Sequence, residues 1–284
     1  LGGTLRLGYV HRGIEKLAES RTYTQNIPLI ERICGICSHV HTTTFCYAVE
    51  ALLGIEIPPR AQYIRALLCE LERIHSHLLW LGVLAKHVGL ETVFMHSWHD
   101  RELVLDIMEE RSGGRVSHGI NQIGGVRFDV DAEHHPMMAD KMQKLHERIT
   151  QFMQIFEREP SIKARTHGVA PLSADLIRQY GLAGPVARAS GVDVDMRRDD
   201  PLPPYDRLDI SVITHPDGDA WSRTYVRIYE IYESLLLCEK ILQAIPEGNI
   251  SVRARRKVPA GEVVVRSEAP RGEVVYYLRS NGTE

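Results

Sequence analysis

The stretch from Pro59 to about His87 constrains the fold more than any other part of this sequence. Its apolar residues recur at steps of three and four over about eight turns, the spacing that places side chains on one side of a helix. These residues are Ile64, Leu67, Leu68, Leu71, Ile74, Leu78, Leu81 and Ala85. The pattern therefore predicts a long, deeply packed helix.

Other stretches predict long helices as well. Residues 91–111 and 131–157 repeat the apolar spacing, and the glycine-rich sequences SGGR and GGVRFDVD separate the helices. Asp219 is a suitable N-cap for a further helix, AWSRTYVRIYEIYESLLLCEKILQAI, which stops before Pro246. Together these helices predict a mainly α fold, built as a long-helix bundle.

Shorter elements connect the long helices. A helix is expected over 34–53, beginning at a cysteine pair and ending at Gly54, and GIEKLAE predicts one helical turn. In SADLIRQYGL, Ser173 can cap a short helix that ends at Gly181. Residues 191–218 hold too many Asp and Pro residues for a helix or a central strand, so they predict a long loop.

Strand signals occur only towards the two ends of the chain. The opening sequence GGTLRLGYV alternates the apolar residues Leu5, Leu7 and Tyr9 with smaller or charged residues, which predicts a strand. Near the other end, GEVVVRSEAPRGEVVYYLRSNGT has two β-rich runs around APRG and predicts a hairpin. We therefore expect a mainly α single domain over 1–284, with small β pieces near both termini.

Composition excludes several classes of protein. Thirty-four basic and 37 acidic side chains leave a formal net charge of −3, so no nucleic-acid partner is expected. No apolar run approaches the roughly 18 residues that a membrane span needs. The cysteines at 34, 37, 46, 69 and 238 are an odd number in a chain too large to need disulfides, which favours a reducing compartment, the cytoplasm by default. Cys46, Cys69 and Cys238 have apolar neighbours and are expected to be packed thiols.

The sequence ERICGICSHVH places Cys34 and Cys37 at the start of a predicted helix. Two sulfurs at this spacing can reach one metal ion, and a helix N-terminus favours their thiolate forms. The pair alone is compatible with a metal site, a redox pair or two packed thiols. A thioredoxin-like context and a second cysteine pair for a closed zinc site are both missing from the sequence. His41, one turn after Cys37, is a candidate ligand or orienting donor.

Other polar residues have ordinary structural explanations. On pattern alone Glu15, in an amphipathic turn beside Lys16, is a solvated charge, and Arg271 could simply close a hairpin. His75 and His77 are two residues apart on the long helix, so at most one is expected to face the core, as a hydrogen-bonded structural histidine.

A resemblance to a known family rests on the following motifs: GYVHRGIEKLAE, ERICGICSHVH, AVEALLGIEIPPRAQYIRALLCELERIHSHLLWLG, GGRVSHGINQIGGVRFD and EAPRGEVVYYLRSNGT. Together they resemble the large subunit of a [NiFe] hydrogenase, an oxidoreductase. The closer match is to the membrane-associated, energy-converting branch, which is related to the quinone-site subunit of respiratory complex I. The likeness covers nearly the whole chain.

The resemblance implies site residues. The family motif R-x-C-G-x-C-x-x-x-H supplies half of a nickel–iron site and aligns with Arg32, Cys34, Cys37 and His41. By this alignment Cys34 would be a terminal nickel thiolate, and Cys37 would bridge nickel and iron. Thiolates are ligands that suit both metals.

Residues outside this motif also match the family. Glu15 matches a carboxylate that relays protons from a nickel thiolate, and Arg271 matches an arginine whose guanidinium lies over the metal pair. Pro270 would line the same pocket.

The chain departs from the family in one respect that concerns the metal. Those hydrogenases carry a second pair, D-P-C-x-x-C, near the C-terminus, and these 284 residues contain no counterpart. We therefore expect a fragment of a longer large subunit, a truncated form or a divergent subunit. A Ni–Fe centre is expected in the full-length protein and an absent or incomplete one in this chain.

Two other functions remain open. The first is a complex I-like NADH:quinone oxidoreductase subunit without nickel, acting as an electron-transfer and quinone-site scaffold. In that subunit aspartate and tyrosine stand where this chain has Cys34 and Gly35, so the cysteines and Gly35 favour nickel chemistry. The second is a pure interaction subunit.

Partners follow from electron counting. H₂ oxidation releases electrons, and no cysteine set here could hold an iron–sulfur cluster, so a partner must carry one. The resemblance implies a small [4Fe-4S] subunit and membrane ion-translocating subunits, and the 191–218 loop could dock one of them. The chain would then be cytoplasmic and peripheral on the inner face of the cell membrane.

Overall fold

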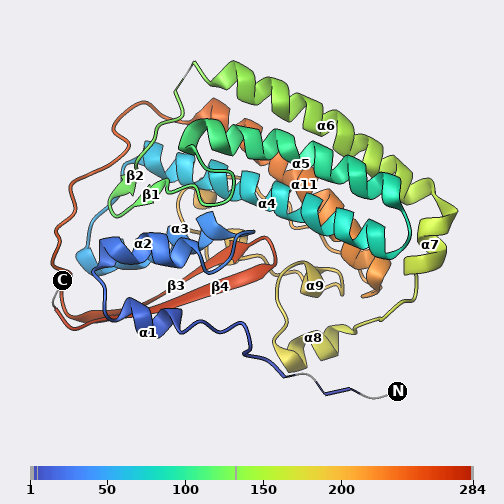
Figure 1. The fold of residues 1–284 in the computed structure, drawn as a ribbon, viewed down its shortest axis with the longest axis horizontal. Helices are drawn as coiled ribbons and strands as arrows, with labels where there is room; N and C mark the ends of the chain where they lie inside the picture. Colours follow the sequence, from blue (N-terminus) through green and yellow to red (C-terminus); the bar gives the residue numbers. More distant parts are fainter. Residues whose placement is uncertain (1–2, 5, 132, 283–284) are drawn as a thin grey trace.

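A computed structural model describes residues 3–4, 6–131 and 133–282, and it confirms a mainly α fold (Figure 1). The helices are α1 (Ile14–Ala18), α2 (Tyr23–Glu31), α3 (Ser38–Leu53), α4 (Pro59–His87), α5 (Glu91–Ser112), α6 (His135–Arg158), α7 (Pro160–Thr166), α8 (Ala174–Tyr180), α9 (Pro185–Arg188), α10 (Met196–Asp199) and α11 (Ala220–Ala244), with a 3-10 turn at Tyr205–Arg207. The strands are β1 (Asn121–Gln122), β2 (Gly125–Val126), β3 (Gly261–Ala269) and β4 (Gly272–Ser280).

The long helices pack around α4. Helices α5 and α11 both lie against α4, and α6 covers α5 and α11 (Figure 1). The predicted apolar side of α4 is buried, with Leu67, Leu71 and Ile74 fully inaccessible to solvent. Each such side chain stabilises the fold by about 1.5–3 kcal/mol relative to exposure. The helix predicted over 59–87 thus forms with the expected ends and is the centre of the core.

Helix ends follow the capping chemistry of the sequence. The Ser173 hydroxyl accepts the Leu176 N–H at 3.2 Å at the start of α8, and the Asp219 carboxylate accepts the Ser222 N–H at 2.8 Å at the start of α11. Gly54 ends α3 in the left-handed conformation that glycine adopts without steric cost. These predicted ends are confirmed.

The helix expected from Cys34 onwards begins later, at Ser38. Residues 32–37 form a turn instead, because the N-terminus of α3 is capped by the buried Glu72 carboxylate of α4. This carboxylate accepts the N–H groups of His39 at 2.6 Å and Val40 at 2.9 Å, which are among the donors that a helix start leaves unpaired. Both cysteines therefore lie in the turn before the helix.

The strand predicted in GGTLRLGYV is wrong for the residues that the structure describes there. Residues 6–10 form no strand, and Leu7, Tyr9 and Val10 are exposed. Leu5 lies outside the described residues. Alternation alone predicts a strand only where a neighbouring strand pairs with it, and none of the described strands does.

One further expectation is wrong, and the structure adds a detail to another. His75 and His77 are both buried, because α5 and α11 cover α4 on more than one side. Residues 191–218 lack long elements as predicted, but the segment is anchored in the core: Arg197 is buried and bonds Asp195 and Glu70.

Some elements were not predicted. Helix α2 begins with a capping box between Thr22 and Gln25 and contains Pro28, whose presence hides the helical pattern. The short pair β1–β2 is antiparallel, and it bridges to Ser251. Helix α6 ends at Arg158, within one residue of the end expected for the 131–157 helix, and a further short helix, α7, starts at Pro160.

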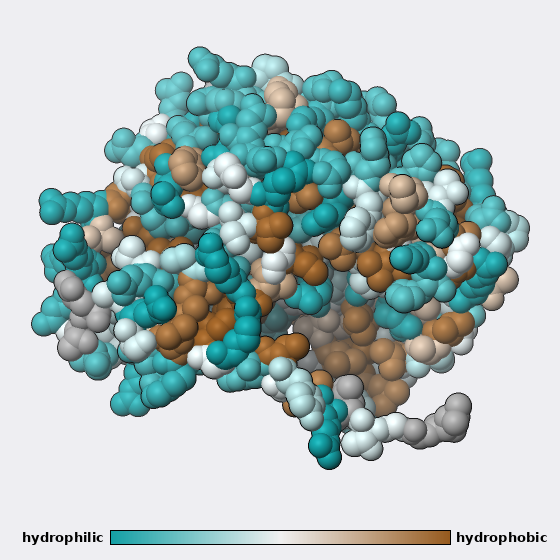
Figure 2. All heavy atoms as spheres, in the orientation of Figure 1, coloured by the Kyte–Doolittle hydropathy of each residue, from teal (hydrophilic) through white to brown (hydrophobic). Residues whose placement is uncertain are grey.

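The C-terminal hairpin forms as predicted. Strands β3 and β4 pair antiparallel with Ala269 opposite Gly272, so Pro270 and Arg271 make a two-residue turn. The hairpin packs on α3, and its outer side leaves three apolar side chains exposed: Val264, Val275 and Tyr277. In the same orientation as Figure 1, Figure 2 shows brown, apolar side chains gathered on the lower part of the molecule, in the region where Figure 1 shows the hairpin and α8. None of the described helices is long and apolar enough to cross a membrane.

Candidate metal centre

The hairpin turn brings Arg271 over the cysteine pair. The Arg271 Nη2 donates to Cys34 Sγ at 2.9 Å and lies 3.4 Å from Cys37 Sγ. The sulfurs come from the turn between α2 and α3, and the guanidinium comes from the turn between β3 and β4. The two cysteines and an arginine more than two hundred positions later in the sequence therefore form one cluster.

The two cysteines differ in their protonation. A hydrogen bond from the Cys37 thiol lowers the pKa of Cys34 to about 5, and the Ile36 N–H and the charge of Arg271 act in the same direction. The pKa of Cys37 is raised, because its thiol donates to Cys34 and is buried. At neutral pH the pair therefore carries one thiolate, at Cys34, and one proton.

An apolar wall closes one side of the sulfur pair. Val40, Cys69 and Ala269 are buried against Cys37 in a small cluster. Gly35 faces Val116: a Cβ at position 35 would meet Val116 Cγ1 at 3.1 Å. The turn between the cysteines thus leaves little room for a side chain at position 35.

His41 and Pro270 lie beside the cluster. Pro270 is buried in the same two-residue turn as Arg271. His41 Nδ1 is 3.0 Å from the Tyr276 hydroxyl, and burial lowers the pKa of His41, with Cys34 and Arg271 as opposing charges nearby. Tyr276, which sequence reasoning missed, therefore fixes the orientation of His41.

Glu15 and Arg32 do not join the cluster. Glu15 is exposed on α1 and pairs with His11 Nε2 at 3.2 Å. Arg32 is exposed and donates to the Pro28 carbonyl at 2.7 Å, back along α2. Glu15 is nevertheless close enough to contribute, after burial and Cys37, to the raised pKa of Tyr276.

Charged residues buried on α4 were also missed. Glu72 is completely buried, and burial raises its pKa to about 8. Glu70, Arg65 and Arg73 are buried on the same helix. The sequence did offer one indication of them: charged residues stand between the apolar positions of the 59–87 stretch. When such a helix is covered on several sides, these charged residues are buried and must find polar partners.

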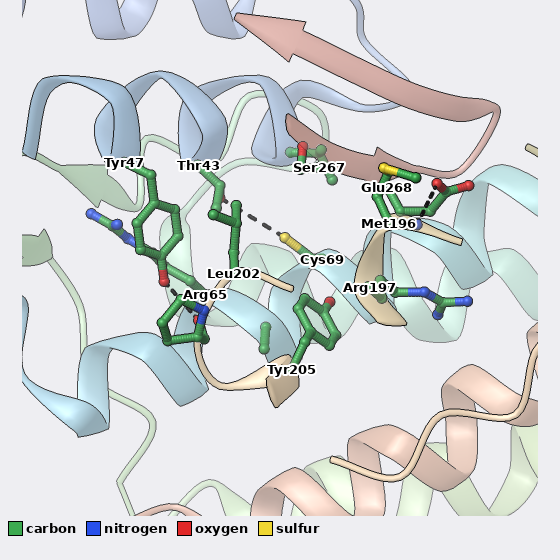
Figure 3. A pocket seen from close by; sticks show the side chains of 13 residues that line it. Thr43, Tyr47, Arg65, Cys69, Met196, Arg197, Leu202, Tyr205, Ser267 and Glu268 are labelled. Carbon is green, nitrogen blue, oxygen red and sulfur yellow. Dashed lines mark hydrogen bonds between the residues drawn. The ribbon is translucent and has the colours of Figure 1, made fainter. Parts of the chain in front are cut away.

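A small cavity lies behind the apolar wall (Figure 3). It has a volume of about 20 Å³, enough for a single water molecule, and Thr43 and Cys69 line it, with their Oγ1 and Sγ atoms 3.9 Å apart. Cys46, Cys69 and Cys238 are buried among apolar residues, as expected for packed thiols.

The donor set fits half of a nickel–iron site. The thiolate and the thiol are soft sulfur donors. The guanidinium of Arg271 lies within 3.4 Å of both sulfurs and adds a fixed positive charge. Within residues 3–4, 6–131 and 133–282, no group of three or more His, Cys, Asp and Glu side chains could hold a metal ion. The described residues therefore offer two sulfur ligands and no complete cage.

Comparisons with known proteins identify the family of the chain. Residues 87–258 match the family model of the respiratory-chain NADH dehydrogenase 49 Kd subunit, and residues 12–86 match that of nickel-dependent hydrogenase. A carbon monoxide-induced hydrogenase of Rhodospirillum rubrum is 41% identical over 98% of this chain and 77% of the relative. A subunit of the NADH-quinone oxidoreductase of Rhizobium meliloti (strain 1021) is 39% identical over 98% of this chain and 76% of the relative.

A solved structure is also similar. One chain in the structure of a membrane-bound sulfane sulfur reductase, an archaeal respiratory membrane complex, is 32% identical to this chain and matches it with a TM-score of 0.92. The match covers 97% of this chain and 76% of the solved chain. The match over residues 87–258 lies within the part of the fold that this structure shares. The chain therefore belongs to the family of oxidoreductase subunits that includes the 49 Kd subunit of respiratory-chain NADH dehydrogenase and nickel-dependent hydrogenases of membrane complexes.

Proposed function

We propose that this chain is part of the catalytic large subunit of a membrane-associated [NiFe] hydrogenase, which cleaves H₂ reversibly into protons and electrons. Cys34 and Cys37 would supply one sulfur pair of the Ni–Fe centre, and the other ligands would come from elsewhere in the parent protein. The single observation that carries the proposal is the Arg271 guanidinium over both sulfurs, at 2.9 and 3.4 Å.

The chemistry divides between the metal and the protein. When bound, the centre supplies the heterolytic cleavage of H₂. Arg271 stays charged at all physiological pH values and holds a reacting species by charge and by its planar fork of donors. The Cys34 sulfur is unprotonated at rest, since its pKa of about 5 lies below neutral pH, and would therefore hold the metal as a thiolate. Pro270 and the apolar wall keep water away from this side of the pair.

Glu15 would pass protons between the site and solvent. It is exposed, as an exit group must be, and its charge acts on Tyr276, which bonds His41. Arg32 would hold the shape of the cysteine turn, since its side chain is bonded to the α2 backbone rather than to sulfur. In this assignment His41 orients groups beside the centre and is not a metal ligand.

The partners follow from the relatives. We propose a small [4Fe-4S] subunit as the electron acceptor, and membrane ion-translocating subunits that hold the complex on the inner face of the membrane. The names of the similar hydrogenase and of the respiratory membrane complex support this arrangement. The long helices would then form the bundle that carries the site, with the cysteine turn facing the cluster-bearing partner.

The alternative is a nickel-free NADH:quinone oxidoreductase subunit, favoured by the match over residues 87–258. Gly35 argues against it, because glycine offers no hydroxyl to the quinone, and a Cβ at this position would already meet Val116 Cγ1 at 3.1 Å. The test is to express the parent gene with its maturation proteins and to measure bound nickel and H₂-dependent dye reduction. Nickel and dye reduction that Cys37→Ser removes support the hydrogenase. A nickel-free complex that reduces quinone with NADH supports the alternative.

A further inference from the structure

The backbone just before the Arg271 turn is held by a buried cation. Arg73 of α4 donates from Nη2 to the Glu268 carbonyl at 2.8 Å and from Nη1 to the Ala269 carbonyl at 3.3 Å. Arg73 is fully buried, and its Nε lies 3.4 Å from the Glu70 carboxylate. The last two residues of β3 are therefore tied to the central helix of the core.

The side chain of Glu268 is held from other elements. Its Oε1 accepts from Arg188 Nη1 of α9 at 2.8 Å, and its Oε2 accepts the Met196 N–H of α10 at 3.2 Å. Arg188 in turn donates to Glu230 of α11 at 2.7 Å. Figure 3 shows the Met196 and Glu268 contact at the end of the hairpin. Helices α4, α9 and α10 thus contact Glu268, three positions before Arg271, and α11 is linked to it through Arg188.

Close backbone packing also restricts the hairpin turn. A Cβ on Gly184 would meet Gly272 Cα at 2.4 Å and the Arg271 carbonyl oxygen at 2.6 Å. Contacts this short leave the turn no space to move towards α9. Gly184 therefore restricts the turn itself, and the guanidinium of Arg73 holds the end of the strand before it.

Stability alone is a weak reason for such a network. Buried ion pairs contribute little net stability, since desolvation offsets their attraction, and apolar residues of similar volume often replace them without loss. An apolar side chain cannot, however, donate the hydrogen bonds by which Arg73 holds two specific backbone carbonyls in place. Arg271 is a long, partly exposed side chain that reaches two sulfurs, so its reach depends on where its backbone lies.

We propose that Arg73 and Glu268 are positioning residues, which hold the hairpin turn so that the Arg271 guanidinium lies over both sulfurs. Their significance for H₂ chemistry rests on the proposed function, whereas the positioning itself does not. Arg73 acts on the backbone, and Glu268 fixes the direction in which the strand enters the turn. Neither residue contacts sulfur, so both act only through Arg271.

The test is a double-variant cycle read at Cys34. The rate of Cys34 alkylation by iodoacetate, an anion that the Arg271 guanidinium attracts, is followed by mass spectrometry in the folded full chain at pH 7. Arg271→Met is expected to slow alkylation about tenfold, because the anionic reagent loses the cation that lies beside the sulfurs. Arg73→Met and Glu268→Gln are each expected to slow it in the same direction. Combining either with Arg271→Met is expected to give the rate of Arg271→Met alone, which identifies action through that residue.

Arg65→Met is the matched control. Arg65 is also buried on α4 and also donates to two backbone carbonyls, those of Gln122 and Gly125, both at 2.9 Å, but these lie away from the hairpin turn. It is expected to lower the melting temperature while leaving the Cys34 rate unchanged. If Arg73→Met does not fold, Glu268→Gln, which keeps the size of the side chain, carries the test.

Three results would overturn the positioning role: unchanged Cys34 rates in both variants, effects that add to that of Arg271→Met, or an equal effect of Arg65→Met. The outcome is independent of nickel. Coupling between Arg73 and Arg271 in a protein that never binds nickel keeps the positioning role and removes the hydrogenase. Nickel binding with additive rates does the reverse.

Discussion

The Glu72 carboxylate of α4 accepts the His39 N–H at 2.6 Å and so fixes the start of the helix that follows the cysteine turn. A second oxygen accepts the Val40 N–H at 2.9 Å. Since these are orphan donors of a helix N-terminus, one buried side chain decides where α3 begins. The position of Cys37, directly before that helix, depends on it.

Replacing Glu72 is expected to destabilise the fold. Glu72→Leu leaves two buried N–H groups without acceptors and should lower the free energy of unfolding by about 2–5 kcal/mol, measured by urea denaturation. Glu72→Gln keeps one carbonyl acceptor, so its loss should be smaller. Equal losses in the two variants would show that the hydrogen bonds do not hold the helix start.

Glu72 also predicts a pH dependence of stability. Burial raises its pKa from the ordinary value of 4.5 to about 8, so between these pH values the folded chain holds a proton that the unfolded chain releases. Its contribution to the free energy of unfolding should therefore fall as pH rises from 4.5 to 8 and stay level above that. Denaturation curves of the wild type and Glu72→Gln, compared across this range, isolate the effect. Parallel curves would contradict it.

Cys34 is expected to be the reactive thiol of the chain. Its pKa of about 5 makes it a thiolate at neutral pH, whereas burial raises the pKa of Cys46 and Cys69. Iodoacetamide at pH 7 should modify Cys34 first, and the rate should level off above about pH 6. Peptide mass spectrometry locates the label. In Cys34→Ser, labelling at pH 7 should drop to the level of the buried thiols.

Gly184 is expected to tolerate no side chain. Gly184→Ala places a Cβ 2.4 Å from Gly272 Cα and should cost about 2–4 kcal/mol by adding overpacking to the strain of its positive φ. Gly181→Ala is the matched control, because Gly181 has a similar φ of +60° but open space around its Cβ position. It should cost only about 1 kcal/mol. Thermal melts of the two variants compare these costs, and equal values would exclude a packing contribution at Gly184.

Nickel loading in the parent protein should depend on two of the cysteines. Cys34→Ser and Cys37→Ser are each expected to abolish bound nickel, since a hydroxyl is a poor ligand for a soft metal. Cys46→Ala is the control, because Cys46 is a packed thiol away from the pair. Elemental analysis of the purified proteins measures the metal. Full nickel in Cys34→Ser would remove this residue from the site.

The sequence could predict what depends on local chemistry. The periodicity of 59–87 fixed the central helix, and the cap residues Ser173 and Asp219 fixed helix starts. The contact of Arg271 with the cysteines followed from motif alignment, since nothing in local pattern links positions so far apart.

What failed depends on tertiary partners. Strand alternation at residues 6–10 had no partner strand, and the start of α3 is set by Glu72, which is more than thirty residues away from it. At most one of His75 and His77 was expected to face the core, yet both are buried, because helical period cannot tell how many sides of a helix are covered. The 191–218 segment was predicted as a long loop, yet Arg197 ties it to Glu70 in the core. Its deletion would remove one of the two cations that compensate this buried carboxylate.

The outer side of the C-terminal hairpin has a practical consequence for handling the protein. The exposed side chains of Val264, Val275 and Tyr277 form an apolar surface there that favours self-association. The net charge of −3 gives only weak electrostatic repulsion between molecules. Purified material should scatter more light as it is concentrated, and kosmotropic salt should bring on clouding sooner.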